Sequence, residues 1–234
     1  MIEVCKVILH RLDMELKHPF RNSLQEVNKK DLFIVEVIDQ DGNHGFGETV
    51  SFTSPWYTEE TTETNLHVIE SFLIPLLMNQ TFEHPDHVSS LFEQVRRNHM
   101  AKAAVEGAIW DLYAKRLGEP LWKVIGGTKP SVDVGVSIGM QSSIQELLHV
   151  IKDNVDAGYK RVKLKVKPGW DIEVLREVRA RFLDLAIMVD ANSAYTVADM
   201  EHLRKFDQFK LMMIEQPFAH DDFIDHARLQ QKLE

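Results

Sequence analysis

From residue 132 onward, the second half of the chain repeats one pattern of apolar and polar positions several times. Short apolar runs, which predict strands, are separated by amphipathic stretches of roughly a dozen residues, which predict helices. The predicted strands are 132–138, 161–166, 185–190 and 211–215, and the predicted helices are 142–157, 171–182, 196–205 and one from about residue 221. Successive strand–helix units indicate a parallel sheet, either doubly wound or closed as a barrel.

The first half of the chain follows a different pattern. Apolar runs predict strands at 4–9, 32–38 and 45–48. The dipeptide Asp41-Gly42 between two such runs predicts a hairpin turn. Helical periodicity then covers 66–76, 87–97 and 101–117. An α+β domain, residues 1–127, is therefore expected to precede an α/β domain, residues 131–234, because the segment between them is rich in glycine and proline.

Composition excludes several classes of function. The chain has 234 residues, 44% of them apolar and 27% charged, as in an ordinary globular protein. A net charge of −9, with no basic stretch interleaved with aromatic residues, argues against a nucleic-acid partner. Cys5 is the single cysteine, which excludes an internal disulfide and indicates a reducing compartment, the cytoplasm. The charged N-terminus and the apolar stretch 72–78, interrupted by Pro75, predict neither an export signal nor a membrane span.

Common cofactor and hydrolase motifs are not found. The segment Gly45-Phe46-Gly47 lacks the third glycine of a dinucleotide fingerprint, and residues 126–131 do not fit a Walker A loop. Neither G-x-S-x-G nor H-E-x-x-H occurs. Nicotinamide, ATP and zinc-protease functions therefore lose their usual support.

Three lysines alternate with apolar residues on one predicted strand. Lys163, Lys165 and Lys167 share one face, so the simplest interpretation is an amphipathic strand with a solvated side. Strands of a parallel sheet are normally covered on both faces, however, and a lysine row there needs a reason. In a barrel, lysines near the C-terminal end of a strand point into the mouth where catalytic groups lie.

Two carboxylates end the next two predicted strands. Taken singly, Asp190 and Glu215 look like helix caps. The steps from Lys165 to Asp190 and from Asp190 to Glu215 are both 25 residues, one strand–helix repeat each. All three side chains are therefore expected at the same C-terminal edge of neighbouring parallel strands.

Lysines beside two carboxylates suit the removal of a proton from a carbon next to a carboxylate. Oxygen ligands can hold a divalent metal ion, which stabilises the enediolate that forms. Lys165, crowded by a second lysine, is the candidate base. A small-molecule carboxylate is the expected substrate.

The motifs together resemble the enolase superfamily, in particular the muconate-lactonizing-enzyme subgroup, over nearly the whole chain. The matching motifs are Gly45-Phe46-Gly47-Glu48, residues 121–127, Lys163-x-Lys165, Val189-Asp190-Ala191-Asn192 and Ile214-Glu215-Gln216-Pro217. The resemblance implies an α+β capping domain followed by a TIM-type (β/α) barrel. It also implies a lysine base acting with Mg²⁺, as in that superfamily, with Mn²⁺ as an alternative.

Within the subgroup, three segments are most similar to o-succinylbenzoate synthases, including those that also racemise N-acylamino acids. These segments are Pro19-Phe20-Arg21, residues 136–139 and residues 163–171. The resemblance implies a dehydratase of menaquinone synthesis that works as a homo-oligomer. Dipeptide epimerase and muconate cycloisomerase share the scaffold and remain alternatives.

The resemblance also implies roles for individual residues. Lys165 would be the base on one face of the substrate, and Lys163 its modulating partner. Asp190 and Glu215 would be metal ligands. The substrate-binding residues would be Ser137, Asn192, Phe20 and Phe52, of which the two phenylalanines would close over the site from the capping domain.

The family pattern extends beyond these motifs. It includes a third acidic ligand on the next strand, at about position 240 by the same repeat, and a second lysine facing Lys165, whereas the sequence ends at Glu234. A full barrel needs roughly 250 residues. We therefore expect a truncated barrel, its first half only, that is inactive unless completed by a longer chain or other chains. A non-catalytic fragment is the remaining alternative.

Overall fold

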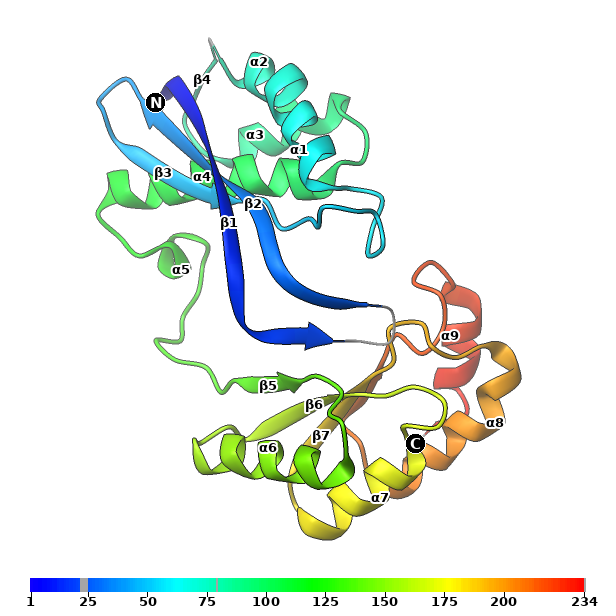
Figure 1. Cartoon of the computed structure of the whole chain (residues 1–234). Coiled ribbons are helices and arrows are strands. Elements are labelled where there is room, and N and C mark those ends of the chain that lie inside the picture. Colours follow the sequence, from blue (N-terminus) through cyan, green and yellow to red (C-terminus); the bar gives the residue numbers. More distant parts are fainter. Residues whose placement is uncertain (22–24, 79, 234) are drawn as a thin grey trace. The chain divides into compact units, whose positions relative to one another are not determined.

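The computed structural model describes residues 1–21, 25–78 and 80–233, with all of their side chains except those of residues 18 and 21. Residue contacts divide the chain into two compact units (Figure 1). The first comprises Met1–Lys17 and Asn28–Pro130, and the second His18–Val27 and Ser131–Glu234. The domain limits 1–127 and 131–234 remain a prediction, since these contacts also place residues 18–27 in the second unit.

The first unit contains a four-stranded sheet with the order β3-β2-β1-β4. Its strands are β1 (Ile2–Arg21), β2 (Glu26–Asp39), β3 (His44–Glu48) and β4 (Thr81–Phe82). The hairpin turn predicted between β2 and β3 is confirmed, with Gly42 in the left-handed region at φ 79°. The carboxylate of Asp39 accepts the backbone N–H groups of Asp41 and Asn43, which ties the turn to the strand before it.

Helices cover one face of this sheet (Figure 1). They are α1 (Thr62–Val68), the π-helical turn η1 (Ile69–Leu73), α2 (Ile74–Leu77), α3 (Asp86–Leu91), the 3₁₀ turn η2 (Phe92–Gln94) and α4 (His99–Leu117). The short helix α5 (Leu121–Val124) follows α4 and buries none of its residues. The helical stretch predicted over 66–76 is thus interrupted. Pro75 has no N–H to donate, so a regular α-helix cannot continue through it, and the widened turn η1 precedes it.

Helix α4 packs directly on β3 through two glycines. A Cβ atom placed on Gly45 would lie 2.1 Å from the carbonyl oxygen of Ala108, and one on Gly47 would lie 2.0 Å from that of Ala104. The buried carboxylate of Glu60 accepts the N–H groups of Met100 and Ala101 at the start of the helix. The missing side chains at Gly45 and Gly47, and the Glu60 carboxylate that caps the start of the helix, therefore set the position of α4.

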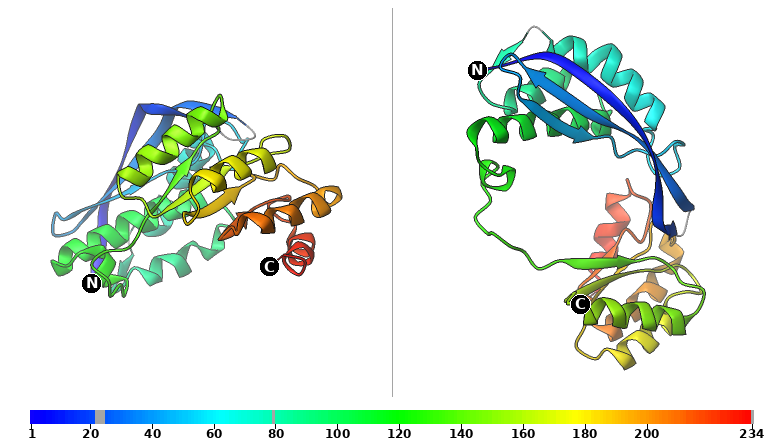
Figure 2. Two further views of the ribbon diagram at one scale, coloured as in Figure 1. Left: turned by 90° about the horizontal axis from the view of Figure 1, so that it is seen from below. Right: turned by 60° about the vertical axis from the view of Figure 1, so that its left-hand side comes forward.

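The second unit contains a parallel sheet with the order β5-β6-β7-β8, as the alternating pattern predicted. Its strands are β5 (Gly135–Ile138), β6 (Arg161–Lys165), β7 (Ala186–Asp190) and β8 (Met213–Glu215). Helices α6 (Ile144–Asp156) and α7 (Ile172–Arg181) lie on one face of the sheet (Figure 2). Strands β5 and β8 are shorter than the apolar runs 132–138 and 211–215 that predicted them.

The last two predicted helices differ in regularity. The helix expected at 196–205 is divided into η3 (Val197–Asp199), α8 (Met200–Leu203) and η4 (Arg204–Phe209), whereas α9 (Phe223–Gln230) is a single helix. Aromatic residues Phe206 and Phe209 on η4 are buried in the core. Among the described residues, no helix has the length and apolar character needed to cross a membrane.

We predict that Gly47→Ala destabilises the first unit by about 3 kcal/mol or more, because its Cβ would collide with backbone and not with a movable side chain. The matched control is Gly107→Ala on α4, whose Cβ would meet nothing closer than 3.9 Å. The control should be stabilised by about 0.5–1 kcal/mol through its higher helix propensity. Urea unfolding followed by circular dichroism measures both, and an unchanged midpoint for Gly47→Ala would contradict the packing argument.

Candidate active site

Parallel pairing brings together the three residues that recur every 25 positions. Lys165 is paired with Asp190 across β6 and β7, and Asp190 with Glu215 across β7 and β8. Each is the last residue of its strand. The expected alignment at one edge of the sheet is confirmed, and it places a lysine and two carboxylates in one row.

The two faces of β6 have opposite characters. Val162 and Leu164 are buried in the core on the helix-covered face. Lys163 and Lys165 alternate with them and so project from the other face. The predicted row of three lysines is shorter in the structure, because β6 ends at Lys165 and the exposed Lys167 begins a tight turn in which Gly169 has φ 81°.

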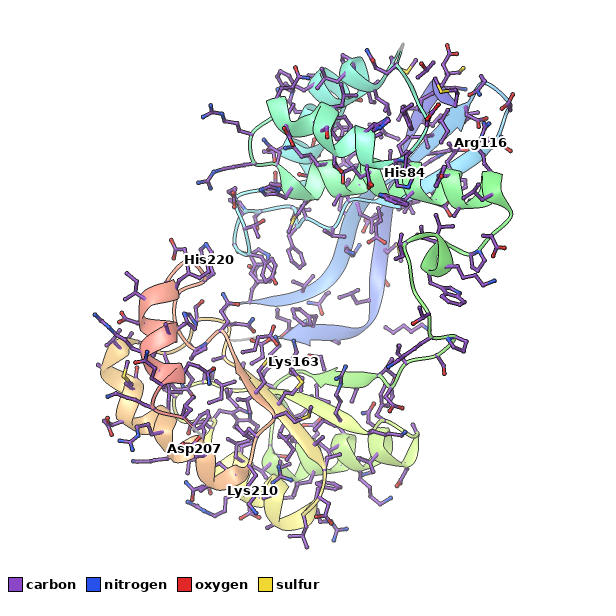
Figure 3. All side chains as sticks on the ribbon, turned by 180° about the vertical axis from the view of Figure 1, so that it is seen from behind. His84, Arg116, Lys163, Asp207, Lys210 and His220 are labelled. Atoms are coloured by element: carbon purple, nitrogen blue, oxygen red, sulfur yellow. The ribbon has the colours of Figure 1, made fainter. Side chains whose placement is uncertain are left out.

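The lysines and carboxylates form a network of short ion pairs. The Nζ atom of Lys165 lies 2.6 Å from Oδ2 of Asp190, and that of Lys163 lies 2.8 Å from Oε2 of Glu215. Lys163 also lies 3.3 Å from the same Asp190 oxygen. Lys165 and Asp190 are only 7% and 2% exposed. Lys163, labelled in Figure 3, thus pairs with both carboxylates.

The surroundings raise the pKa of Lys163. Partial burial acts in the opposite direction, but the hydrogen bond to Glu215 and the charges of Asp190 and Glu215 outweigh it. The ammonium form of Lys163 is therefore favoured beside the two carboxylates.

The remaining predicted site residues occupy different positions. Ser137 is paired with Lys163 across β5 and β6 and is exposed on the same face. Asn192 follows β7, and its Oδ1 accepts a hydrogen bond of 2.8 Å from Nζ of Lys165. The ring centroid of Phe20, in the part of β1 grouped with the second unit, lies 5.8 Å from the same Nζ, a cation–π distance.

Phe52 belongs to the first unit. Its ring packs against those of Trp56 and Tyr57, with centroid distances of 4.5 Å and 5.9 Å. Residues 50–52 thus form a loop with an aromatic group, and its substrate-binding role stays a prediction.

The donor atoms at the strand ends suit a hard divalent cation. Asp190 and Glu215 both direct an oxygen at the Lys163 ammonium, so the two carboxylates converge on one point. Magnesium in proteins is typically held by one or two carboxylates together with water and substrate oxygens. In the part of the chain that the structure describes, no group of three or more His, Cys, Asp or Glu side chains is arranged to hold a metal ion. Asp190 and Glu215 form a pair of carboxylates, which could hold such an ion together with water and substrate oxygens.

A second polar cluster next to the site was not predicted. The carboxylate of Asp171 contacts the side chains of Tyr195 and His202, close to the loops that follow β6 and β7. Each residue alone resembles an ordinary cap or core residue. Asp171 and Tyr195 are 24 residues apart, close to the 25-residue repeat, so extending the repeat from the strand ends to the loops could have revealed them.

A cavity of about 240 Å³ in the same unit is separate from the site. It lies between η4, β8 and α9, and its lining includes Asp207 and Lys210 but none of the predicted site residues. Figure 3 places these two residues well away from Lys163. The chemistry therefore centres on the strand ends and not on this cavity.

Family models match both halves of the chain. The model described as "Mandelate racemase / muconate lactonizing enzyme, N-terminal domain" matches residues 4–126, and the one described as "Enolase C-terminal domain-like" matches residues 146–234. Together they cover the capping part and most of the parallel sheet.

Individual proteins are also similar over the whole chain. An o-succinylbenzoate synthase from Geobacillus stearothermophilus is 53% identical over 233 residues, which are 100% of this chain and 62% of that protein. An N-succinylamino acid racemase from Thermus thermophilus is 40% identical over 96% of this chain and 61% of that protein. The crystal structure of an enolase-superfamily member from Listeria innocua has a TM-score of 0.96 and 44% identity, covering 100% of this chain and 63% of its own. The chain thus spans less than two thirds of the length of these relatives.

We predict that Glu215→Gln lowers the pKa of Lys163. Burial disfavours the ammonium form, and in the variant one of the two carboxylates that offset this effect is gone. In the unmodified protein the folded-state pKa exceeds the ordinary value of 10.5. The stability that Lys163 contributes is therefore complete below that value and is lost as the pH rises through the folded-state pKa.

The measurement is urea unfolding at pH 8 and at pH 11. The stability difference between the wild type and Glu215→Gln should shrink at the higher pH. Glu177→Gln, at an exposed position on α7, is the matched control and should show no pH-dependent difference. A difference that grows with pH would contradict the assignment.

Proposed function

Because this chain belongs to the mandelate racemase / muconate lactonizing enzyme family of the enolase superfamily, we propose that it supplies the base and two metal-binding carboxylates of an o-succinylbenzoate synthase. Such an enzyme is a lyase that removes water after taking a proton from a carbon next to a carboxylate. The observation that carries the proposal is the row of Lys165, Asp190 and Glu215 at the ends of three adjacent parallel strands. Its product would enter menaquinone synthesis.

Lys165 is the proposed base. The nitrogen lone pair of its neutral form takes the substrate proton, and the electrons of the broken C–H bond pass into the carboxylate to form an enediolate. The same Nζ then holds a proton that it can return to the departing hydroxyl group, so that water leaves and the lysine is regenerated. Asp190 and Asn192 hold Nζ from two sides, which fixes its direction before the reaction.

A divalent cation, Mg²⁺ or Mn²⁺, held by Asp190 and Glu215, would neutralise the second negative charge of the enediolate. Lys163 supplies further positive charge next to the same carboxylates. The centroid of the Phe20 ring lies 5.8 Å from Nζ of Lys165, where it would stabilise the positive charge that the lysine acquires with the proton. Each residue thus either moves the proton or stabilises the charge that its removal creates.

A second activity, racemisation of N-acylamino acids, is supported by the 40% identity to the N-succinylamino acid racemase. Both reactions begin with the same proton abstraction, so one base serves either. Epimerisation of dipeptides and cycloisomerisation of muconate start from related enolate chemistry on this scaffold. Turnover on the o-succinylbenzoate precursor, N-succinylamino acids, dipeptides and muconate separates these activities. We further propose a homo-oligomer in a reducing compartment, the cytoplasm, where Cys5 stays free.

Lys165→Ala should reduce exchange of the substrate α-proton with deuterated solvent by about 10³-fold or more on the face that Lys165 serves, because among the described residues the neighbouring lysine, Lys163, is held by Asp190 and Glu215. Lys160→Ala is the matched control, since that lysine is exposed and pairs with Asp133 before the start of β6, whereas the candidate site lies at the C-terminal ends of the strands. Exchange is measured by proton NMR on the longest available form of the enzyme. Retained exchange in Lys165→Ala would refute the assignment of the base.

The 234-residue polypeptide alone is expected to show little turnover in the presence of Mg²⁺. The described residues place a base and two carboxylates on one face of the parallel sheet, whereas proton-transfer chemistry also needs a site that is closed against water on the opposite side of the substrate. Turnover is measured on the o-succinylbenzoate precursor, with the Lys165→Ala polypeptide as background. Substantial turnover above that background, without a partner chain, would contradict this expectation.

A further inference from the structure

The carboxylate of Asp171 joins three segments around the loops that follow β6 and β7. One oxygen accepts the N–H of Ile172 at the start of α7, with a distance of 2.6 Å. The other accepts the hydroxyl of Tyr195 at 2.9 Å and lies 2.8 Å from Nε2 of His202 on α8. Asp171 and Tyr195 are 6% and 3% exposed. A carboxylate buried this deeply requires such partners, which makes the cluster a fixed junction.

Tyr195 ends a turn whose backbone is strained. Asn192 and Ser193 both have positive φ angles, 45° and 62°, which asparagine tolerates but which serine adopts rarely, and two in succession need support from their surroundings. The N–H of Ser193 donates to the carbonyl of Gln216, and that of Tyr195 donates to the carbonyl of Pro217. The turn is thus held on one side by the loop after β8 and, through the Tyr195 side chain, by Asp171.

This turn determines where the Asn192 side chain points. The backbone N–H of Asn192 donates a hydrogen bond to Oδ1 of Asp190, and the side-chain Oδ1 of Asn192 accepts one from Nζ of Lys165. If the turn relaxed toward ordinary φ values, the direction of the Asn192 side chain would change and Nζ of Lys165 would lose its hydrogen bond to Asn192. The position of the proposed base is therefore coupled to the anchor of the turn.

We propose that Tyr195, together with Asp171 and His202, is a positioning group that holds Asn192 against Lys165. The Tyr195 ring packs at 6.2 Å from both His202 and Phe206, so the tyrosine fills space and donates a hydrogen bond at once. Burial, reinforced by the hydrogen bond to Asp171, raises the pKa of Tyr195, which keeps the hydroxyl a donor. The catalytic consequence rests on the proposed function, whereas the structural coupling does not.

Tyr195→Phe is the decisive variant, because it keeps the ring and removes only the hydroxyl. Tyr159→Phe, in the turn after α6 of the same unit, is the matched control. Amide hydrogen exchange is followed by NMR. In Tyr195→Phe, the backbone amides of residues 193 and 195 should exchange about 10-fold faster or more, which is the acceleration expected when one hydrogen bond to a charged group is lost. The amides of β6 and β7 should keep their wild-type rates. Unchanged rates in the turn, or equal acceleration throughout the unit, would overturn the proposal.

Kinetics on the complete enzyme tests the coupling to Lys165. Tyr195→Phe should lower kcat for α-proton exchange about 10-fold with KM within twofold, and it should add nothing further in an Asn192→Ala background. Independent, multiplicative effects of the two substitutions would overturn the coupling. If the wild-type enzyme shows no α-proton exchange with any of the tested substrates, the proposed function fails, and the hydrogen-exchange result still decides the positioning role.

Discussion

The unbroken parallel register of β6, β7 and β8 is the constraint on which the site depends. Because side chains alternate between the faces of a strand, a slip of one residue would turn Asp190 or Glu215 away from Lys165. The register is set by the opposite face, where apolar side chains of β6 and β7 enter the same core as the helices. Packing on one face of the sheet thus determines the chemistry on the other.

The sequence was sufficient to predict this arrangement because both of its causes are periodic. Alternation of period two assigns the faces of a strand, and equal 25-residue steps place successive strand ends at the same edge. These signals survive without knowledge of the tertiary structure. They are weaker at the boundaries: β5 starts at Gly135, three residues after the predicted strand, because Val132 and Val134 are exposed and pack against no core.

The features that sequence reasoning missed depend on contacts between loops. Asparagine tolerates a positive φ angle, but nothing in residues 191–195 indicates that Ser193 adopts one as well, since the conformation of the turn also depends on the carbonyls of the neighbouring loop. Tyr195 likewise resembles a core aromatic until Asp171 is seen to accept its hydroxyl. Pro75 is a contrasting case, because its missing N–H is a local property from which the interruption of the helix predicted over 66–76 could have been anticipated, although the π-helical turn itself could not.

The charges at the strand ends are difficult to explain by stability alone. Removing a lysine and an aspartate from water carries a desolvation penalty that their mutual attraction offsets only in part, and a well-packed apolar pair of similar volume is often as stable or more so. Lys165 and Asp190 are nevertheless more than nine-tenths buried, and Asn192 accepts a further hydrogen bond from Nζ of Lys165. The core residues on the helix-covered face already supply apolar burial for this unit. A buried ion pair on the opposite face, with an acceptor supplied by a turn of positive φ angles, therefore fits the proposed function, because proton transfer requires one nitrogen and two carboxylates in a fixed geometry, whereas folding does not.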